Sequence, residues 1–237
     1  MADSEARRVA FFGGSFDPPH LGHLAVARAA RDALQLDTVL FAPVGTQPLK
    51  PQGSTASFRD RLRMTELAIA GQRGFEVSQI DAPDPSSHPN YTLETLRRLR
   101  ASLPTGAQLF CLMGADSFLT LHQWHGAADI PFAATLIVAS RPGQSLNDLQ
   151  CALPRGVDLA EGNQAAPVST SGIELRSFRL RNTAGQSAEF HLLPGLDVEI
   201  SASEIREQLR ANSDAENPRQ LLPPAVTRYI RERGLYR

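Results

Sequence analysis

The sequence predicts an α/β protein built on a doubly wound, mostly parallel sheet with flanking helices. Two observations carry this prediction. Short apolar runs that end at glycine or proline recur along the first part of the chain, as expected of buried parallel strands. Between these runs lie stretches whose apolar residues repeat at helical spacing. Alternation of strands and helices in this way is typical of a doubly wound sheet.

The elements follow in order along the chain. The first strand is predicted at Val9–Phe12, because this apolar run is ended by Gly13 and Gly14. Helices are predicted over 21–34 and 92–102, and a third whose apolar face runs from Phe58 to Ile69 and which ends near Gly71. Strands are predicted over 38–42, 75–78, 108–113 and 134–140. Together these elements predict a Rossmann-like sheet.

The segment 143–190 interrupts this alternation, since it is rich in glycine and proline and poor in helix signals. We predict that it is an insertion that contains a hairpin, with strands over 173–180 and 188–193. The C-terminal part, 195–237, is predicted to be helical, with helices over 201–211 and 224–233. We expect a single domain over 1–237.

Composition excludes several classes of protein. The chain has 24 Lys and Arg against 25 Asp and Glu, so bulk charge provides no grip on a nucleic acid. Two cysteines are too few for a disulfide scaffold or a four-cysteine zinc site, which fits a reducing compartment. Neither a signal peptide nor a membrane span is evident in the sequence. We therefore expect a cytoplasmic protein without membrane or nucleic-acid partners; its oligomeric state stays open.

The strongest signal for chemistry is the segment Gly13–His23, which reads GGSFDPPHLGH. It lies between the first predicted strand and the first predicted helix, where ligands of open α/β sheets bind. The glycines allow the backbone to approach a phosphate, and a helix N-terminus attracts an anion. His20 and His23 share one face of the first helical turn, and Gly22 leaves room beside them. Their imidazoles can donate hydrogen bonds to phosphate oxygens and can carry positive charge.

Other interpretations of this segment are weaker. No Gly-Lys-Ser/Thr follows, so it is not a Walker loop, and the dinucleotide pattern of three spaced glycines is missing. A single histidine at a helix start can be a cap or a packed side chain. The pair could bind a metal, but no third ligand at suitable spacing is evident, so we predict no metal site within the protein.

The residues at 20–23 (HLGH) resemble the HxGH signature of the nucleotidyltransferase superfamily, and 200–206 (ISASEIR) resembles its second signature. More narrowly, the chain resembles the bacterial nicotinate-nucleotide adenylyltransferases. Four further pieces support this narrower likeness: 91–96 (YTLETL), 114–117 (GADS) with Trp124 downstream, 141–143 (RPG), and 226–230 (VTRYI) with 234–236 (GLY). The likeness covers roughly 8–142 and 190–237 and leaves the predicted insertion uncovered.

The resemblance implies that the chain joins ATP and nicotinate mononucleotide to give deamido-NAD and pyrophosphate in NAD biosynthesis, with Mg²⁺ accompanying ATP. It assigns His20 and His23 to catalysis. It assigns to ATP binding a set of residues from the two signatures: Gly13, Gly14, Ser15, Phe16, Gly22, Ser201, Ser203 and Arg206. Ser201 and Glu204 also form a capping-box pattern, so helix capping is an alternative role for this segment.

The resemblance also implies five residues for the mononucleotide: Lys50, Thr92, Asp116, Trp124 and Arg141. Each has a structural alternative or an open role. Lys50 could be a solvated surface residue and Trp124 a core residue. Thr92 and Asp116 could be helix caps. Arg141 could bind the mononucleotide or close the site.

Alternative functions stay open at this point. Pantetheine-phosphate and nicotinamide-mononucleotide adenylyltransferases, and cytidylyltransferases, share the HxGH signature, which therefore does not separate them. A class I tRNA synthetase relative is disfavoured, because no KMSKS-like run or anticodon-binding domain is evident. A non-catalytic nucleotide sensor on the same scaffold would bind ATP without releasing pyrophosphate.

Overall fold

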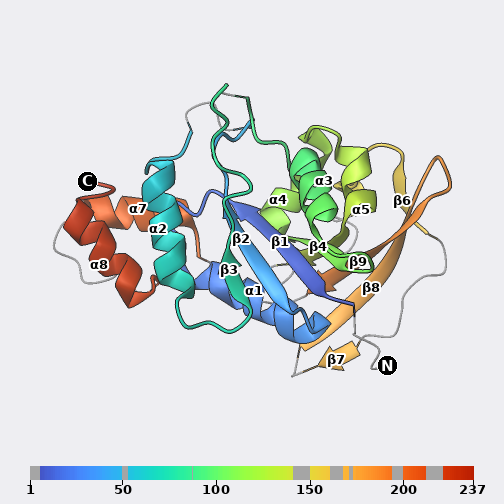
Figure 1. The fold of residues 1–237 in the computed structure, drawn as a ribbon, viewed down its shortest axis with the longest axis horizontal. Coiled ribbons are helices and arrows are strands. Elements are labelled where there is room, and N and C mark those ends of the chain that lie inside the picture. The colour runs from blue at the N-terminus through green and yellow to red at the C-terminus, as the bar shows by residue number, and fades with distance from the viewer. Residues whose placement is uncertain are drawn as a thin grey trace. The chain divides into compact units, whose positions relative to one another are not determined.

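The fold is seen in a computed structural model that describes residues 6–49, 53–86, 88–140, 150–160, 168–170, 173–193, 200–211 and 221–237. The helices are α1 (Leu21–Leu34), α2 (Phe58–Ile69), α3 (Thr92–Ser102), α4 (Ala115–Leu119), α5 (Ile130–Ala133), α7 (Ala202–Ala211) and α8 (Pro224–Arg233), with short 3₁₀ turns η1 (Leu121–Gln123) and η2 (Ala127–Asp129). The strands are β1 (Arg8–Gly14), β2 (Thr38–Pro43), β3 (Phe75–Val77), β4 (Gln108–Gly114), β5 (Thr135–Ala139), β6 (Val157–Leu159), β7 (Val168–Thr170), β8 (Ile173–Asn182) and β9 (Ser187–Leu193) (Figure 1).

The strand order confirms the predicted doubly wound α/β fold. The order is β3-β2-β1-β4-β5-β9-β8-β6, and β7 pairs with β8. The chain winds outward from β1 to β2 and β3, then returns and winds the other way through β4 and β5. β1, β4, β5 and β9 are parallel neighbours, as in a sheet whose connections cross over through helices.

The predicted hairpin is confirmed, but it is not set apart from the sheet. β8 and β9 pair antiparallel, with Phe178 opposite Phe190, and β9 then pairs parallel with β5. The segment therefore extends the parallel sheet by an antiparallel edge, a common arrangement in α/β proteins. The short strands β6 and β7 were not predicted.

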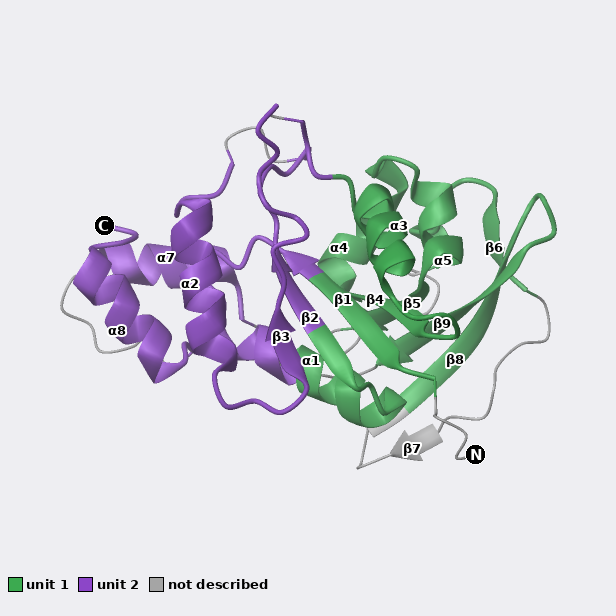
Figure 2. Cartoon of the chain, in the orientation of Figure 1, with its two compact units in different colours: residues 1–12, 26–39, 91–197 green, residues 13–25, 40–90, 198–237 purple. Residues whose placement is uncertain are grey.

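The chain divides into two compact units (Figure 2). Unit 1 comprises 1–12, 26–39 and 91–197, and its centre contains the buried apolar side chains of the parallel strands. Phe118 and Phe178 both lie against Phe190, with ring centroids 5.5 and 5.9 Å away. These contacts bury the middle of the hairpin's second strand against α4. The prediction of a single domain over 1–237 stays a prediction.

Unit 2 comprises 13–25, 40–90 and 198–237. Its core includes a row of aromatic rings in which Phe41 lies 5.6 Å from Phe16 and 5.2 Å from Phe75. The predicted C-terminal helices are confirmed as α7 and α8, and α8 packs against α2. Unit 2 thus gathers the turn after β1 and the helical C-terminal part.

A close backbone contact gives a stability prediction. A Cβ atom at Gly45 would lie 2.4 Å from the backbone nitrogen of Pro83 and 2.5 Å from its Cα, so Gly45→Ala must push two loops apart. We expect a loss of about 1–3 kcal/mol in the free energy of unfolding, measured by urea denaturation. Gly114→Ala is the matched control, because a Cβ there would meet nothing within 4 Å. Equal stability of both variants would show that the contact at Gly45 does not constrain the two loops.

Candidate functional site

The turn after β1 is shaped by close packing around Gly14. The Gly14 carbonyl accepts a hydrogen bond from Val44 N at 2.9 Å, which holds the turn to the end of β2. Phe16 is buried with a φ of 45°, and its ring would lie 3.3 Å from a Cβ at Gly14. A side chain at Gly14 would crowd that ring. The sequence therefore folds into a tight turn in which the Gly14 backbone lies directly against the Phe16 ring.

His20 and His23 are brought together as the sequence predicts. α1 begins at Leu21, so His20 directly precedes the helix and His23 lies in its first turn. Their rings stack, with centroids 3.7 Å apart and planes inclined by 28°. The backbone N–H of His20 donates to Nδ1 of His23 at 3.2 Å, and Phe16 contacts the His23 ring edge-on at 4.9 Å. Because Nδ1 of His23 accepts, the neutral ring carries its proton on Nε2 and presents a donor there.

Both imidazoles are neutral near pH 7 in the free protein. Burial lowers the pKa of His20 from its ordinary 6.5 to about 4. The pKa of His23 is also lowered well below 6.5, by burial first and by the neighbouring His20 second. The positive charge that these rings can carry is thus not present in the free site. A bound polyanion would favour the charged forms and raise both pKa values.

One atom of this pair points to a ligand. His20 is only 7% exposed, and its buried Nδ1 has no hydrogen-bond partner within the part of the chain that the structure describes. Leaving a buried polar atom unsatisfied costs about 1–3 kcal/mol, so such atoms are rare outside functional sites. A ligand or an ordered water that bonds to Nδ1 would remove this cost.

Arg206 is brought to the same turn from the far end of the chain. Its Nη1 donates to the backbone carbonyl of Asp17 at 2.8 Å, and its Nη2 donates to Ser203 Oγ at 3.1 Å. Ser201 lies just before α7, and its carbonyl accepts from Ile205 N at 3.0 Å, as expected at a helix start. Two of the predicted second-signature residues, Ser203 and Arg206, are therefore linked to the segment that leads into His20.

A buried carboxylate closes the turn. Asp17 accepts hydrogen bonds from the backbone amides of Thr55 at 2.6 Å and Ala56 at 3.1 Å, and from the hydroxyl of Tyr236 at 2.7 Å. Three segments of the chain thus meet at one side chain that is 4% exposed. Neither Asp17 nor Tyr236 was predicted as a site residue, although Asp17 lies within the motif.

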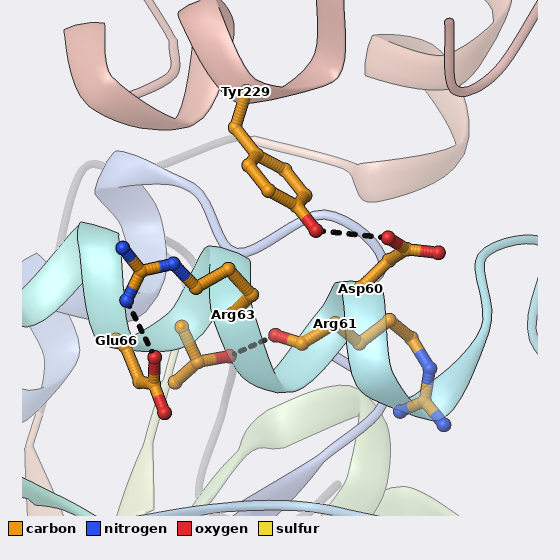
Figure 3. Close-up of polar contacts among 6 residues, drawn as sticks. Asp60, Arg61, Arg63, Glu66 and Tyr229 are labelled. Atoms are coloured by element: carbon orange, nitrogen blue, oxygen red, sulfur yellow. Dashed lines mark hydrogen bonds and ion pairs between the residues drawn. The ribbon is translucent and has the colours of Figure 1, made fainter. Parts of the chain in front are cut away.

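Arg61 is a second buried group that sequence reasoning missed. Its guanidinium donates to the backbone carbonyls of Ser15 at 2.7 Å, Val44 at 2.7 Å and Ala56 at 3.3 Å. Burial lowers its pKa, and the Asp17 charge opposes that shift. Figure 3 shows Arg61 on α2. The signal that could have found it was its place on the buried face of the predicted helix, where an arginine is unusual unless it is paired.

In unit 1, the structure brings together the segments that carry Thr92 and Trp124. The rings of Tyr91 and His125, their chain neighbours, lie 4.4 Å apart. Tyr91, not Thr92, is the N-cap of α3, so the capping alternative for Thr92 is wrong. Trp124 is half-buried and its indole N–H reaches Thr120 Oγ1 at 3.4 Å, so it is not a core residue.

The remaining predicted residues have different outcomes. Asp116 is exposed on α4 at the carboxyl end of β4, and the N-cap of α4 is Gly114, so the capping alternative is wrong here too. Gly22 is buried in α1 between the two histidines. Lys50 and Arg141 lie outside the described residues.

The described ranges contain no built metal site of the usual kind. Within them, no group of three or more His, Cys, Asp or Glu side chains is arranged to hold a metal ion. Every helix in the same ranges is too short or too polar to span a bilayer.

The sequence matches a known protein family and several curated relatives. Residues 11–208 match the family model described as cytidylyltransferase-like. A probable nicotinate-nucleotide adenylyltransferase of Pelobacter propionicus is 37% identical over 97% of this chain and 98% of its own length, and one of Gloeobacter violaceus is 37% identical over 97% and 96%. The match therefore extends through 143–190, which corrects the expectation that the likeness leaves this segment uncovered.

Solved structures show the same fold. A Plasmodium falciparum nicotinic acid mononucleotide adenylyltransferase complexed with NaAD has a TM-score of 0.69 at 15% identity, covering 97% of each chain. A putative nicotinate-nucleotide adenylyltransferase of Vibrio parahaemolyticus has a TM-score of 0.57 at 16% identity, covering 94% of this chain and 97% of its own. At these identities the likeness concerns the fold alone.

The buried His20 gives a prediction for stability against pH. Its folded pKa of about 4 lies below the ordinary 6.5, so between these values the unfolded chain binds more protons. The free energy of unfolding therefore falls as the pH drops from 6.5 towards 4, by about 3 kcal/mol from His20. We expect His20→Gln to lose about that much less stability on acidification, measured by urea denaturation at a series of pH values.

The control for this test is His88→Gln, which changes an exposed histidine. An identical pH dependence in His20→Gln and the wild type would show that His20 is not held neutral by burial.

Proposed function

The chain belongs to the cytidylyltransferase-like family and, within it, to the nicotinate-nucleotide adenylyltransferases, and from this premise we propose that it joins ATP to nicotinate mononucleotide, giving deamido-NAD and pyrophosphate. It is a nucleotidyltransferase. The observation that carries the proposed reaction is the stacked His20–His23 pair that follows the glycine turn in the chain, in which the buried His20 has an unsatisfied ring nitrogen. Such a site suits a polyanionic substrate.

The reaction needs positioning and charge stabilisation more than covalent chemistry. An oxygen of the mononucleotide's 5′-phosphate bonds to the α-phosphorus of ATP, while the bond between that phosphorus and the oxygen leading to the β-phosphorus breaks. Pyrophosphate carries away the electron pair. Phosphoryl-type transfers of this kind are accelerated by in-line alignment and by donors aimed at the developing charge.

The histidines provide those donors. His23 presents its Nε2–H because its Nδ1 accepts from the His20 backbone N–H, and the His20 ring stacks beside it. Both rings start neutral, so ATP can enter without displacing another anion. As negative charge gathers on the phosphates, the pKa of each ring rises and the charged form stabilises it.

The rest of the ATP site is assigned as the resemblance implies. Backbone groups of Gly13, Gly14, Ser15 and Phe16 line the turn, and Gly22 keeps the helix surface low beside the rings. Arg206 uses two of its five N–H donors on Asp17 and Ser203, and its other donors are proposed for the β- or γ-phosphate. Ser201 and Ser203 stand at the start of the same helix.

Mg²⁺ is proposed to enter as part of the ATP substrate. Asp17, the buried carboxylate nearest the histidines in sequence, already accepts from two amides and a hydroxyl, so it is a poor magnesium ligand. The ion would be held by phosphate oxygens and water, as Mg²⁺ commonly is.

For the mononucleotide, we propose that the half-exposed indole of Trp124 stacks on the pyridine ring and that the Thr92 hydroxyl contacts its carboxylate. Asp116 is proposed for the ribose hydroxyls, and Lys50 and Arg141 stay predictions from the sequence. The names of the relatives favour nicotinate over nicotinamide. A cytoplasmic location also stays a prediction.

Pyrophosphate release with a panel of acceptors tests this function. Purified protein and Mg²⁺–ATP are combined separately with nicotinate mononucleotide, nicotinamide mononucleotide, phosphopantetheine and no acceptor. We expect fastest release with nicotinate mononucleotide. Release with phosphopantetheine alone would overturn the proposed substrate, and ATP binding without release in any arm would indicate a nucleotide sensor.

A substitution tests the role of the histidine pair. We expect His23→Ala to lower kcat by about 10²-fold or more, the scale of losing one charge-stabilising donor. His88→Ala, at an exposed position, is the control and should leave kcat unchanged. A loss of less than about threefold in His23→Ala would contradict the role assigned to this ring.

A further inference from the structure

The next-to-last residue of the chain is tied to the candidate site. Tyr236 is 5% exposed, and its hydroxyl donates to Asp17 Oδ1 at 2.7 Å. Its backbone has a φ of 64°, a conformation that costs free energy in a residue other than glycine. The chain thus adopts a strained conformation near its end, and that conformation places this hydroxyl on a buried carboxylate.

Asp17 links Tyr236 to the Gly13–Phe16 turn. Its other carboxylate bonds are to the amides of Thr55 and Ala56, and its backbone carbonyl accepts from Arg206. Asp17 follows the Gly13–Phe16 turn and precedes His20 by three residues. Any displacement of Asp17 therefore moves both the phosphate-facing turn and the start of α1.

Removing the Tyr236 hydroxyl would leave Asp17 Oδ1 with one fewer donor inside a buried site. The pKa of Tyr236 is raised above its ordinary 10, by burial first and by the Asp17 charge second. The phenol therefore keeps its proton and acts as a donor throughout the neutral range. Buried hydrogen bonds to a charged group are among the stronger ones in proteins.

We propose that Tyr236 is a positioning residue for the adenylyl-transfer reaction: its hydroxyl, acting through Asp17, holds the Gly13–Asp17 turn and His20 in the geometry that the ATP phosphates require. This rests on the proposed function. Tyr236 makes no contact with the reacting atoms in this role. The segment that follows α8 is then a structural part of the phosphate site.

The chain offers a matched control in Tyr229. Its hydroxyl donates to Asp60 Oδ1 at 2.9 Å, which joins α8 to α2 (Figure 3). This is the same kind of bond, a tyrosine hydroxyl on an aspartate, in the same unit. Asp60 also bonds Ser57 and lies 3.7 Å from Arg233, but it is not part of the turn. Tyr229→Phe therefore reports the cost of losing such a bond away from the site.

The test compares Tyr236→Phe with Tyr229→Phe in steady-state turnover of Mg²⁺–ATP and nicotinate mononucleotide. We expect Tyr236→Phe to lower kcat by about tenfold and to raise KM for ATP, while KM for the mononucleotide changes by less than about twofold. Tyr229→Phe should keep all three parameters within about twofold. Equal kinetic effects in the two variants would overturn the proposal, because they would indicate a general loss of stability.

Asp17→Asn provides a second, independent variant. Because Tyr236 acts through Asp17, the variant that combines Asp17→Asn with Tyr236→Phe should have a kcat no lower than that of Asp17→Asn alone. If the fold-losses in kcat of the two single variants multiply in the double variant, Tyr236 does not act through Asp17.

A measurement without turnover separates this proposal from the proposed function. Amide hydrogen exchange of the ligand-free protein should become faster over 13–24 and at 55–56 in Tyr236→Phe and stay unchanged there in Tyr229→Phe. Unchanged exchange in Tyr236→Phe would overturn the proposal that Tyr236 holds the turn through Asp17 (the tether), even if the wild type is active. If the wild type turns over none of the acceptors, the proposed function fails, while the exchange result still decides whether the tether exists.

Discussion

The buried carboxylate of Asp17 is the interaction on which the candidate site depends. It holds two amides of the segment before α2 and the hydroxyl of Tyr236, while its own carbonyl holds Arg206. A charge so deeply buried is unfavourable unless its lone pairs are satisfied, and here three donors satisfy it. Arg61 adds to this arrangement by donating to three backbone carbonyls of the same region. Hydrogen bonds to these two charged side chains therefore hold the segment that follows the glycines in place.

This scaffold allows two imidazoles to stand uncharged and close together. Stacked rings 3.7 Å apart would repel each other if both were protonated, and burial removes that charge. The two rings can therefore bind an anion, because no carboxylate of the described residues is bound to them. The ligand-free protein is less stable as a result, because Nδ1 of His20 is unsatisfied and burial disfavours the charged form of both rings. Such local costs are typical of sites whose stability is completed by the ligand.

Much of the fold could be predicted because its elements carry strong periodic signals. α1 was predicted with its bounds, α2 was predicted from its apolar face, and the 173–193 hairpin was predicted from two strands joined by a turn. The partner of β9 could not be predicted, since pairing with β5 is a long-range choice that local pattern does not encode. In the site, the HLGH segment identified both histidines. Arg61 and Tyr236 were missed because their roles come from contacts with backbone or side chains distant in sequence.

Ring-nitrogen NMR of the ligand-free protein at pH 7 tests the central claim most directly. We predict that the imidazoles of His20 and His23 are both neutral and that His23 carries its proton on Nε2. Addition of Mg²⁺–ATP should then move at least one of the two rings towards the charged form. A positively charged ring in the free protein at pH 7, or a His23 proton on Nδ1, would contradict the claim that burial keeps this pair neutral and aimed at an incoming anion.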